Sequence, residues 1–82
     1  MYFVYYLRSI NYLDKFYIGF TADLKKRLSN HNAGTTDHTS KYKPWKLIAY
    51  FAFDSKDCAI DFESYLKSGS GRAFLAKRLL KY

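Results

Sequence analysis

The chain has 82 residues, so a single domain spanning residues 1–82 is expected. Hydrophobic residues make up 49% of the chain and aromatic residues 21%, a composition that excludes intrinsic disorder as its main state. The longest apolar runs are too short for a membrane helix, and no cleaved signal peptide is expected. The single cysteine, Cys58, excludes an internal disulfide and favours a reducing, cytoplasmic location.

The charge balance is the first indication of a partner. Fourteen lysines and arginines against seven acidic residues give a formal charge of +7. Nucleic acid is the usual partner of a small basic domain, and the alternative is a basic surface that only promotes solubility. The charge is uneven, because five basic residues and no acidic residue follow Glu63: Lys67, Arg72, Lys77, Arg78 and Lys81.

The N-terminal part of the chain predicts a β-hairpin. Residues 2–8 and 15–20 are rich in aromatic and β-branched side chains, which are typical of strands. In the second segment, Phe16, Ile18 and Phe20 fall on one face, and Tyr17 and Gly19 on the other. Gly19 is expected to leave an open position where a backbone or a ligand can approach closely.

A helix is predicted after the hairpin. Thr21 or Asp23 can cap its first turn, it is expected to run to about residue 32, and Gly34 can end it. A polar loop over residues 35–45 follows.

The rest of the chain predicts one strand and two helices. Residues 46–53 are apolar on both faces, so this strand is expected to be the central one. A helix over residues 56–67, a break over residues 68–71 and a last helix over residues 72–80 follow. The order β-β-α-β-α-α predicts an α+β fold, a three-stranded antiparallel sheet flanked by helices.

Three polar residues depart from the amphipathic pattern of the two longer helices. At about 100° per residue, Arg27 and His31 lie one turn apart on the apolar stripe of the first helix. They indicate either the wall of a cleft or, for Arg27, a long side chain that reaches past the stripe to solvent. Glu63, the only glutamate of the chain, lies beside the apolar stripe of the second helix. It must be hydrogen-bonded, bound to a metal or held in a structural ion pair.

The sequence resembles the GIY-YIG nucleases over nearly its whole length. The segments that carry the resemblance are Phe3-Val4-Tyr5, Tyr17-Ile18-Gly19, Leu24-x-x-Arg27-Leu28-x-x-His31-Asn32-x-Gly34, Lys43-Pro44-Trp45-Lys46-Leu47 and Glu63-x-Tyr65-Leu66-Lys67. The chain looks like the small standalone bacterial members, which are similar to the catalytic domain of the nucleotide excision repair endonuclease subunit. It departs from the family in having Phe3 in place of the leading glycine and in having no asparagine after Asn32.

The resemblance implies a set of functional residues. Tyr5, Tyr17, Arg27 and His31 match catalytic positions, and Glu63 matches the ligand of one divalent metal ion, Mg or Mn. The reaction implied is the hydrolysis of a phosphodiester bond.

The residue types fit that chemistry. A carboxylate such as Glu63 can hold one hard cation, and the fork of Arg27 can bind a phosphate oxygen. Tyr17 is the preferred base or water-orienting group, His31 is the competing base, and Tyr5 is expected to hydrogen-bond and position. Seven basic residues are expected to contact the nucleic-acid backbone without reading bases: Lys41, Lys43, Lys46, Lys67, Arg72, Lys77 and Arg78.

The sequence therefore predicts a cytoplasmic, metal-dependent endonuclease with low sequence specificity, with DNA as the favoured substrate and DNA repair as the setting. No membrane and no small-molecule cofactor are expected. The alternative is a nucleic-acid-binding module of the same fold with little or no cleavage activity.

Overall fold

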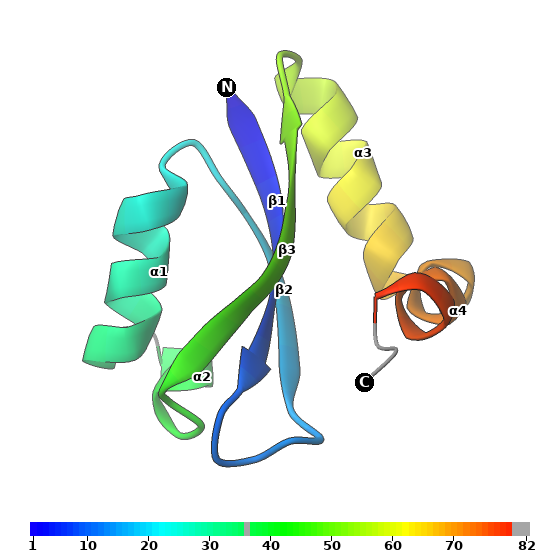
Figure 1. Ribbon diagram of the computed structural model, residues 1–82. Helices are drawn as coiled ribbons and strands as arrows, with labels where there is room; N and C mark the ends of the chain where they lie inside the picture. The colour runs from blue at the N-terminus through cyan, green and yellow to red at the C-terminus, as the bar shows by residue number, and fades with distance from the viewer. Residues whose placement is uncertain (36, 80–82) are drawn as a thin grey trace.

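The computed structural model describes residues 1–35 and 37–79. Three strands and four helices are formed by these residues (Figure 1). In chain order they are β1 (Tyr2–Ser9), β2 (Phe16–Thr21), α1 (Leu24–Ala33), α2 (Asp37–Ser40), β3 (Trp45–Phe53), α3 (Lys56–Lys67) and α4 (Gly69–Arg78). No helix among the described residues is long and apolar enough to cross a membrane.

The three strands form one antiparallel sheet in the order β2-β1-β3, which confirms the predicted α+β class and the hairpin of β1 and β2. The prediction that β3 is central was wrong, because β1 occupies the centre and β3 an edge. Helices cover both faces of the sheet, α1 on one side and α3 on the other (Figure 1). Leu47 therefore packs on the α1 side and Ile48 on the α3 side, which explains why an edge strand is apolar on both faces.

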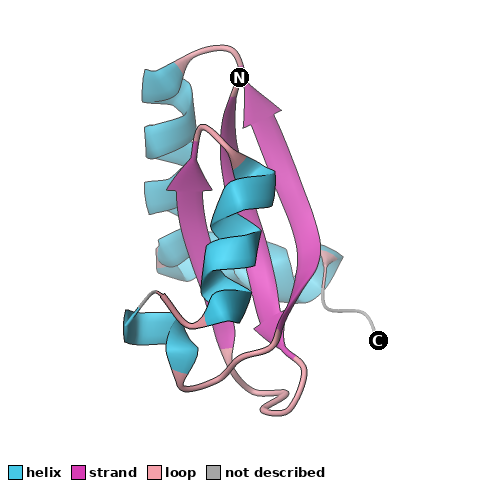
Figure 2. Cartoon of the chain, turned by 90° about the vertical axis from the view of Figure 1, so that its left-hand side faces the viewer, coloured by secondary structure: helices cyan, strands magenta, loops and turns pink. Residues whose placement is uncertain are grey.

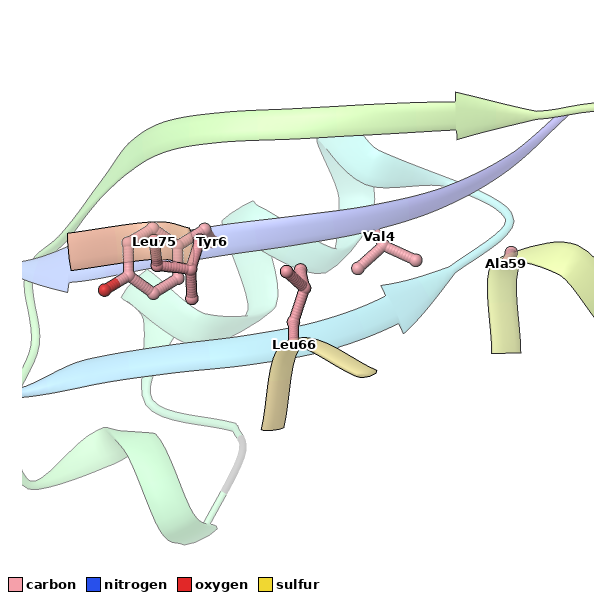
Figure 3. Close-up of a cluster of buried hydrophobic side chains, with 5 residues drawn as sticks. All are labelled: Val4, Tyr6, Ala59, Leu66 and Leu75. Atoms are coloured by element: carbon pink, nitrogen blue, oxygen red, sulfur yellow. The ribbon is translucent and has the colours of Figure 1, made fainter. Parts of the chain in front are cut away.

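Alternation along β1 divides the core into two clusters. Val4 and Tyr6 point to the α3 side, where they pack with Ala59, Leu66 and Leu75 (Figure 3). The neighbouring side chains of β1 point to the α1 side, where Tyr5 and Leu7 pack with Trp45. The same alternation in β2 places Ile18 and Phe20 on the α3 side and Tyr17 on the α1 side, as predicted. Two tyrosines of the predicted site thus share one face of the sheet.

The ends of α1 and α3 lie where capping residues predict them. The Asp23 side chain accepts a hydrogen bond from the backbone N–H of Lys26, and Gly34 ends α1 with a φ of 78°. Ser55 caps α3 in the same way by accepting from the backbone N–H of Cys58. These caps fix the start of α1 and so the helical positions of the side chains that follow.

Two boundaries differ from the prediction. The polar segment over residues 35–45 includes the single turn of α2. The predicted break over residues 68–71 is a cap instead, because the Ser68 hydroxyl accepts from the backbone N–H of Gly71 and starts α4 at Gly69. The predicted end of the last helix at residue 80 lies outside the described residues.

Candidate active site

A buried hydrogen-bonded chain joins β1, α1 and α2. The Tyr5 hydroxyl lies 2.8 Å from Nε2 of His31, and Nδ1 of His31 lies 2.7 Å from the Thr39 hydroxyl. Tyr5 and Thr39 are each 1% exposed, and His31 is not exposed at all. Both ring nitrogens of His31 therefore have partners inside the protein, and solvent does not reach the ring.

Tyr17 extends this cluster from β2. Its ring centroid lies 4.9 Å from that of His31 and 6.2 Å from that of Tyr5. Gly19 pairs with Tyr5 across the two strands, and a side chain at Gly19 would overlap Oη and Cζ of Tyr5. The expectation of an open position at Gly19 was wrong, because the ring of Tyr5 fills that space. The glycine makes room for a tyrosine rather than for a ligand.

Arg27 is the exposed member of the predicted site on α1. It lies one turn before His31 on α1, and its positive charge acts on the Tyr5 hydroxyl, where it favours the ionised form. The residue is exposed overall, and it lines a hollow of about 370 Å³ at the start of α1. The other residues that line this hollow are Thr21, Ala22, Asp23, Lys26 and Asn30. Arg27 therefore reaches solvent, as one predicted alternative has it, and it also forms part of the wall of a hollow, as the other has it.

Glu63 comes from the other side of the sheet. Its helix, α3, runs behind the β2 edge of the sheet when α1 faces the viewer (Figure 2). The carboxylate lies 3.1 Å from Nζ of Lys67, one turn later, and the two side chains are 22% and 52% exposed. The predicted alternative of an ion pair is thus present, but as a partly solvated pair on one helix. The negative charge of Glu63 also acts on the Tyr5 hydroxyl, where it favours the neutral form.

A single carboxylate fits a magnesium-type site better than an all-protein cage. No group of three or more His, Cys, Asp or Glu side chains that could hold a metal occurs among residues 1–35 and 37–79. Mg²⁺ is commonly held by one or two carboxylates together with water and substrate phosphate. Glu63 therefore suits a hard cation that arrives with, or binds together with, a phosphate group.

Burial sets the protonation of the two inner groups. Burial, with a smaller effect of Tyr17, raises the pKa of Tyr5 to about 12, although Arg27 opposes the shift. Burial, followed by the positive charge of Arg27, lowers the pKa of His31. Near neutral pH, Tyr5 is therefore a neutral phenol and His31 a neutral imidazole.

The lowered pKa of His31 predicts how stability depends on pH. Below pH 6.5, the pKa of a histidine in the unfolded chain, His31 binds a proton in the unfolded protein that it does not bind in the folded protein. The free energy of unfolding therefore falls as the pH falls. This residue contributes a slope of at most about 1.4 kcal/mol per pH unit. Thermal unfolding between about pH 7 and 5.5 should show the slope. His31→Gln should remove it, whereas the same change at the exposed His38 should not, and an unchanged slope in His31→Gln would contradict the assignment.

Comparison with known proteins shows the family. A family model described as the GIY-YIG catalytic domain matches residues 1–77. The chain belongs to the GIY-YIG family. UPF0213 proteins of Streptococcus pyogenes serotypes M3 and M1 are each 40% identical to it over 70 residues, which cover 83% of this chain and 76% of the relative. The solution NMR structure of a UPF0213 protein from Bacillus halodurans matches with a TM-score of 0.56 and 30% identity, covering 99% of this chain and 86% of that one.

The match confirms the resemblance and gives the chain a nuclease-type catalytic domain, whereas the name UPF0213 states no reaction. Within this GIY-YIG domain, Tyr5, Tyr17 and His31 lie together on the α1 face, and the positive charge of Arg27 acts on Tyr5. Glu63 acts on the same hydroxyl from α3. Convergence of all five side chains around one phosphate and one ion stays a prediction.

The predicted backbone-binding residues are all exposed but fall into two groups. Three lie around the start of β3 and the segment before it: Lys41, Lys43 and Lys46. Four lie at the end of α3 and along α4: Lys67, Arg72, Lys77 and Arg78. Helix α4 is on the opposite side of the sheet from α1 (Figure 1). The group on α3 and α4 therefore lies away from the α1 face, which holds Tyr5, Tyr17 and His31.

Thr39 is a residue of the site that sequence reasoning missed. It lies in the polar segment, where no apolar period and no family motif of the chain single it out. Its link to His31 depends on the single turn of α2, which places its side chain against α1. No signal in the sequence could have found it.

Proposed function

We propose that the protein is a divalent-metal-dependent nuclease that hydrolyses phosphodiester bonds in nucleic acid, with DNA as the favoured substrate. The observation that carries the proposal is the set of groups around the Tyr5 hydroxyl. The hydroxyl lies 2.8 Å from Nε2 of His31, and the charges of Arg27 and Glu63 both act on it. A domain that only binds nucleic acid does not need a buried tyrosine–histidine pair.

The proposed roles follow from exposure and hydrogen bonding. Arg27, at the surface, binds a non-bridging oxygen of the scissile phosphate. Tyr17 is less buried than Tyr5, so it is the better candidate to orient the attacking water or to accept its proton. His31 is fully buried with both nitrogens bonded, which favours an indirect role through Tyr5 over direct contact with water.

Glu63 is the proposed ligand of the metal ion. When bound, a divalent cation would neutralise charge on the phosphate and on the leaving oxygen. Lys67 now occupies one side of the carboxylate, so cation binding has to compete with this ion pair. Because an exposed pair of this kind is worth only about 0.3–0.5 kcal/mol, the competition is weak.

Binding is proposed to depend on the phosphate backbone rather than on base sequence. The seven exposed lysines and arginines named above supply the positive charge for such contacts. Phosphate contacts release counterions, so affinity should fall steeply as salt rises. A cytoplasmic location and a role in DNA repair stay predictions.

A cleavage assay tests the proposal. The purified chain is incubated with plasmid, branched and single-stranded DNA and with RNA, in Mn²⁺, in Mg²⁺ and in EDTA. Cleavage is expected with metal and none with EDTA, because one carboxylate and the phosphate must share the cation.

Binding measured on the same substrates in EDTA distinguishes the alternative. Salt-sensitive binding with no cleavage of any substrate in either metal would favour the binding module. Cleavage that persists in EDTA would contradict the metal-dependent mechanism.

A further inference from the structure

The roles proposed above leave Thr39 without one, although its buried hydroxyl lies 2.7 Å from Nδ1 of His31. A buried polar side chain costs free energy unless it is hydrogen-bonded, so the contact satisfies both groups. It also sets the direction of the hydrogen-bonded chain, because a neutral imidazole has one donor nitrogen and one acceptor nitrogen.

The direction follows from the difference between the two hydroxyls that contact His31. A phenol O–H is more acidic than the O–H of a threonine, so the Tyr5 hydroxyl is the stronger donor and the Thr39 hydroxyl is the better acceptor. The Tyr5 O–H is then directed to Nε2 of His31, 2.8 Å away. Nε2 must therefore be the acceptor nitrogen, and the proton of the imidazole lies on Nδ1, which donates to Thr39.

We propose that Thr39 is a positioning residue of the active site, whose hydroxyl oxygen accepts the Nδ1–H of His31 and so keeps Nε2 available to the Tyr5 O–H. The proposal rests on the proposed nuclease function, because the group that is ultimately oriented is the Tyr5 hydroxyl of the proposed active site. Without the Thr39 hydroxyl, the imidazole gains by moving its proton to Nε2, which turns a donor toward Tyr5 and reverses the chain.

Thr39 is itself held in place by β3. Its carbonyl oxygen accepts a hydrogen bond from Nε1–H of Trp45 at 2.9 Å and from the backbone N–H of Tyr42 at 3.1 Å. The backbone of Trp45 is tied in turn to α1, because it donates to and accepts from the side chain of Asn32. The single turn of α2 is thus fixed against the helix that carries His31. This arrangement keeps the Thr39 hydroxyl at Nδ1.

The tautomer of His31 can be measured directly. In a two-bond ¹H–¹⁵N spectrum of the ¹⁵N-labelled full chain, His31 should show a protonated Nδ1 and an unprotonated Nε2. The exposed His38 is the other histidine of the chain, and its substitution by glutamine assigns the signals. A protonated Nε2 in the wild-type protein would overturn the proposal, and this result needs no variant to fold.

Two substitutions test the role of the hydroxyl. Thr39→Val keeps the shape of the side chain and removes the acceptor, so His31 should change tautomer. Cleavage should fall about 10- to 100-fold in kcat with little change in KM, the range found when a hydrogen-bond partner that orients a metal-bound histidine is removed. Thr39→Ser keeps the hydroxyl and should restore both the tautomer and the rate.

The outcomes separate the two proposals. An unchanged tautomer and rate in folded Thr39→Val would overturn the role of Thr39. So would a failure of Thr39→Ser to restore them. If the wild-type chain cleaves no substrate, the nuclease proposal fails, whereas the tautomer still reports whether Thr39 sets the proton on His31.

Discussion

Glu63→Gln is expected to lower metal-dependent cleavage by orders of magnitude while leaving the fold intact. The amide keeps the size of the side chain but is a poor ligand for a hard cation. The lost ion pair with Lys67 is partly solvated and joins residues one turn apart, so its loss should cost no more than about 0.5 kcal/mol. Cleavage rates with Mn²⁺ and Mg²⁺, together with thermal unfolding, measure the two effects separately.

Binding gives the third measurement on the same variant. Because Glu63→Gln removes a negative charge, binding of nucleic acid in EDTA should be unchanged or slightly tighter. The matched control is Asp61→Asn, which removes the same charge from an exposed position of α3. The control should bind similarly and cleave normally. A large loss of stability in Glu63→Gln with normal cleavage by the folded fraction would make Glu63 a structural residue and leave the proposed metal without its ligand.

The sequence predicted the parts of the fold that local patterns determine. Period-two alternation placed Tyr17 on the correct face of β2, and Asp23 and Gly34 gave the limits of α1 because capping is a local interaction. The order of the strands was not predictable in this way. An apolar pattern on both faces shows that a strand is covered on both sides, and helices on both faces of a small sheet cover an edge strand as well as a central one.

The residues of the candidate site also divide into those that local patterns predict and those that only the tertiary structure determines. Helical periodicity brought Arg27 and His31 together, and the structure adds that both interact with Tyr5. Periodicity could not show which group fills the space above Gly19, because that depends on the register between two strands. Nor could it find Thr39, whose place beside His31 depends on tertiary contacts of a single helical turn.

The register of Tyr5 and Gly19 makes the glycine a sensitive position. A Cβ at Gly19 would overlap Oη and Cζ of Tyr5 and would lie 2.9 Å from Cε2 of Tyr17. Tyr5 is 1% exposed and has no room to move outward, so Gly19→Ala must displace its ring and break its contact with His31. We expect a loss of about 1–3 kcal/mol, and each kcal/mol lowers the Tm of a domain of this size by about 4–8 °C.

Gly69→Ala is the control for Gly19→Ala, and a Tyr5→Leu background tests whether the Tyr5 ring causes the expected loss of stability. Nothing lies within 4 Å of a Cβ at Gly69, so Gly69→Ala should leave the Tm unchanged or raise it. If the ring of Tyr5 is what Gly19→Ala displaces, the same change should cost clearly less in a Tyr5→Leu background, because the overlapping ring atoms are gone. Thermal unfolding of the two single variants and the double variant measures this coupling. An equal cost of Gly19→Ala in both backgrounds would mean that the glycine is required for a reason other than Tyr5. The packing that places the Tyr5 hydroxyl against His31 would then need another explanation.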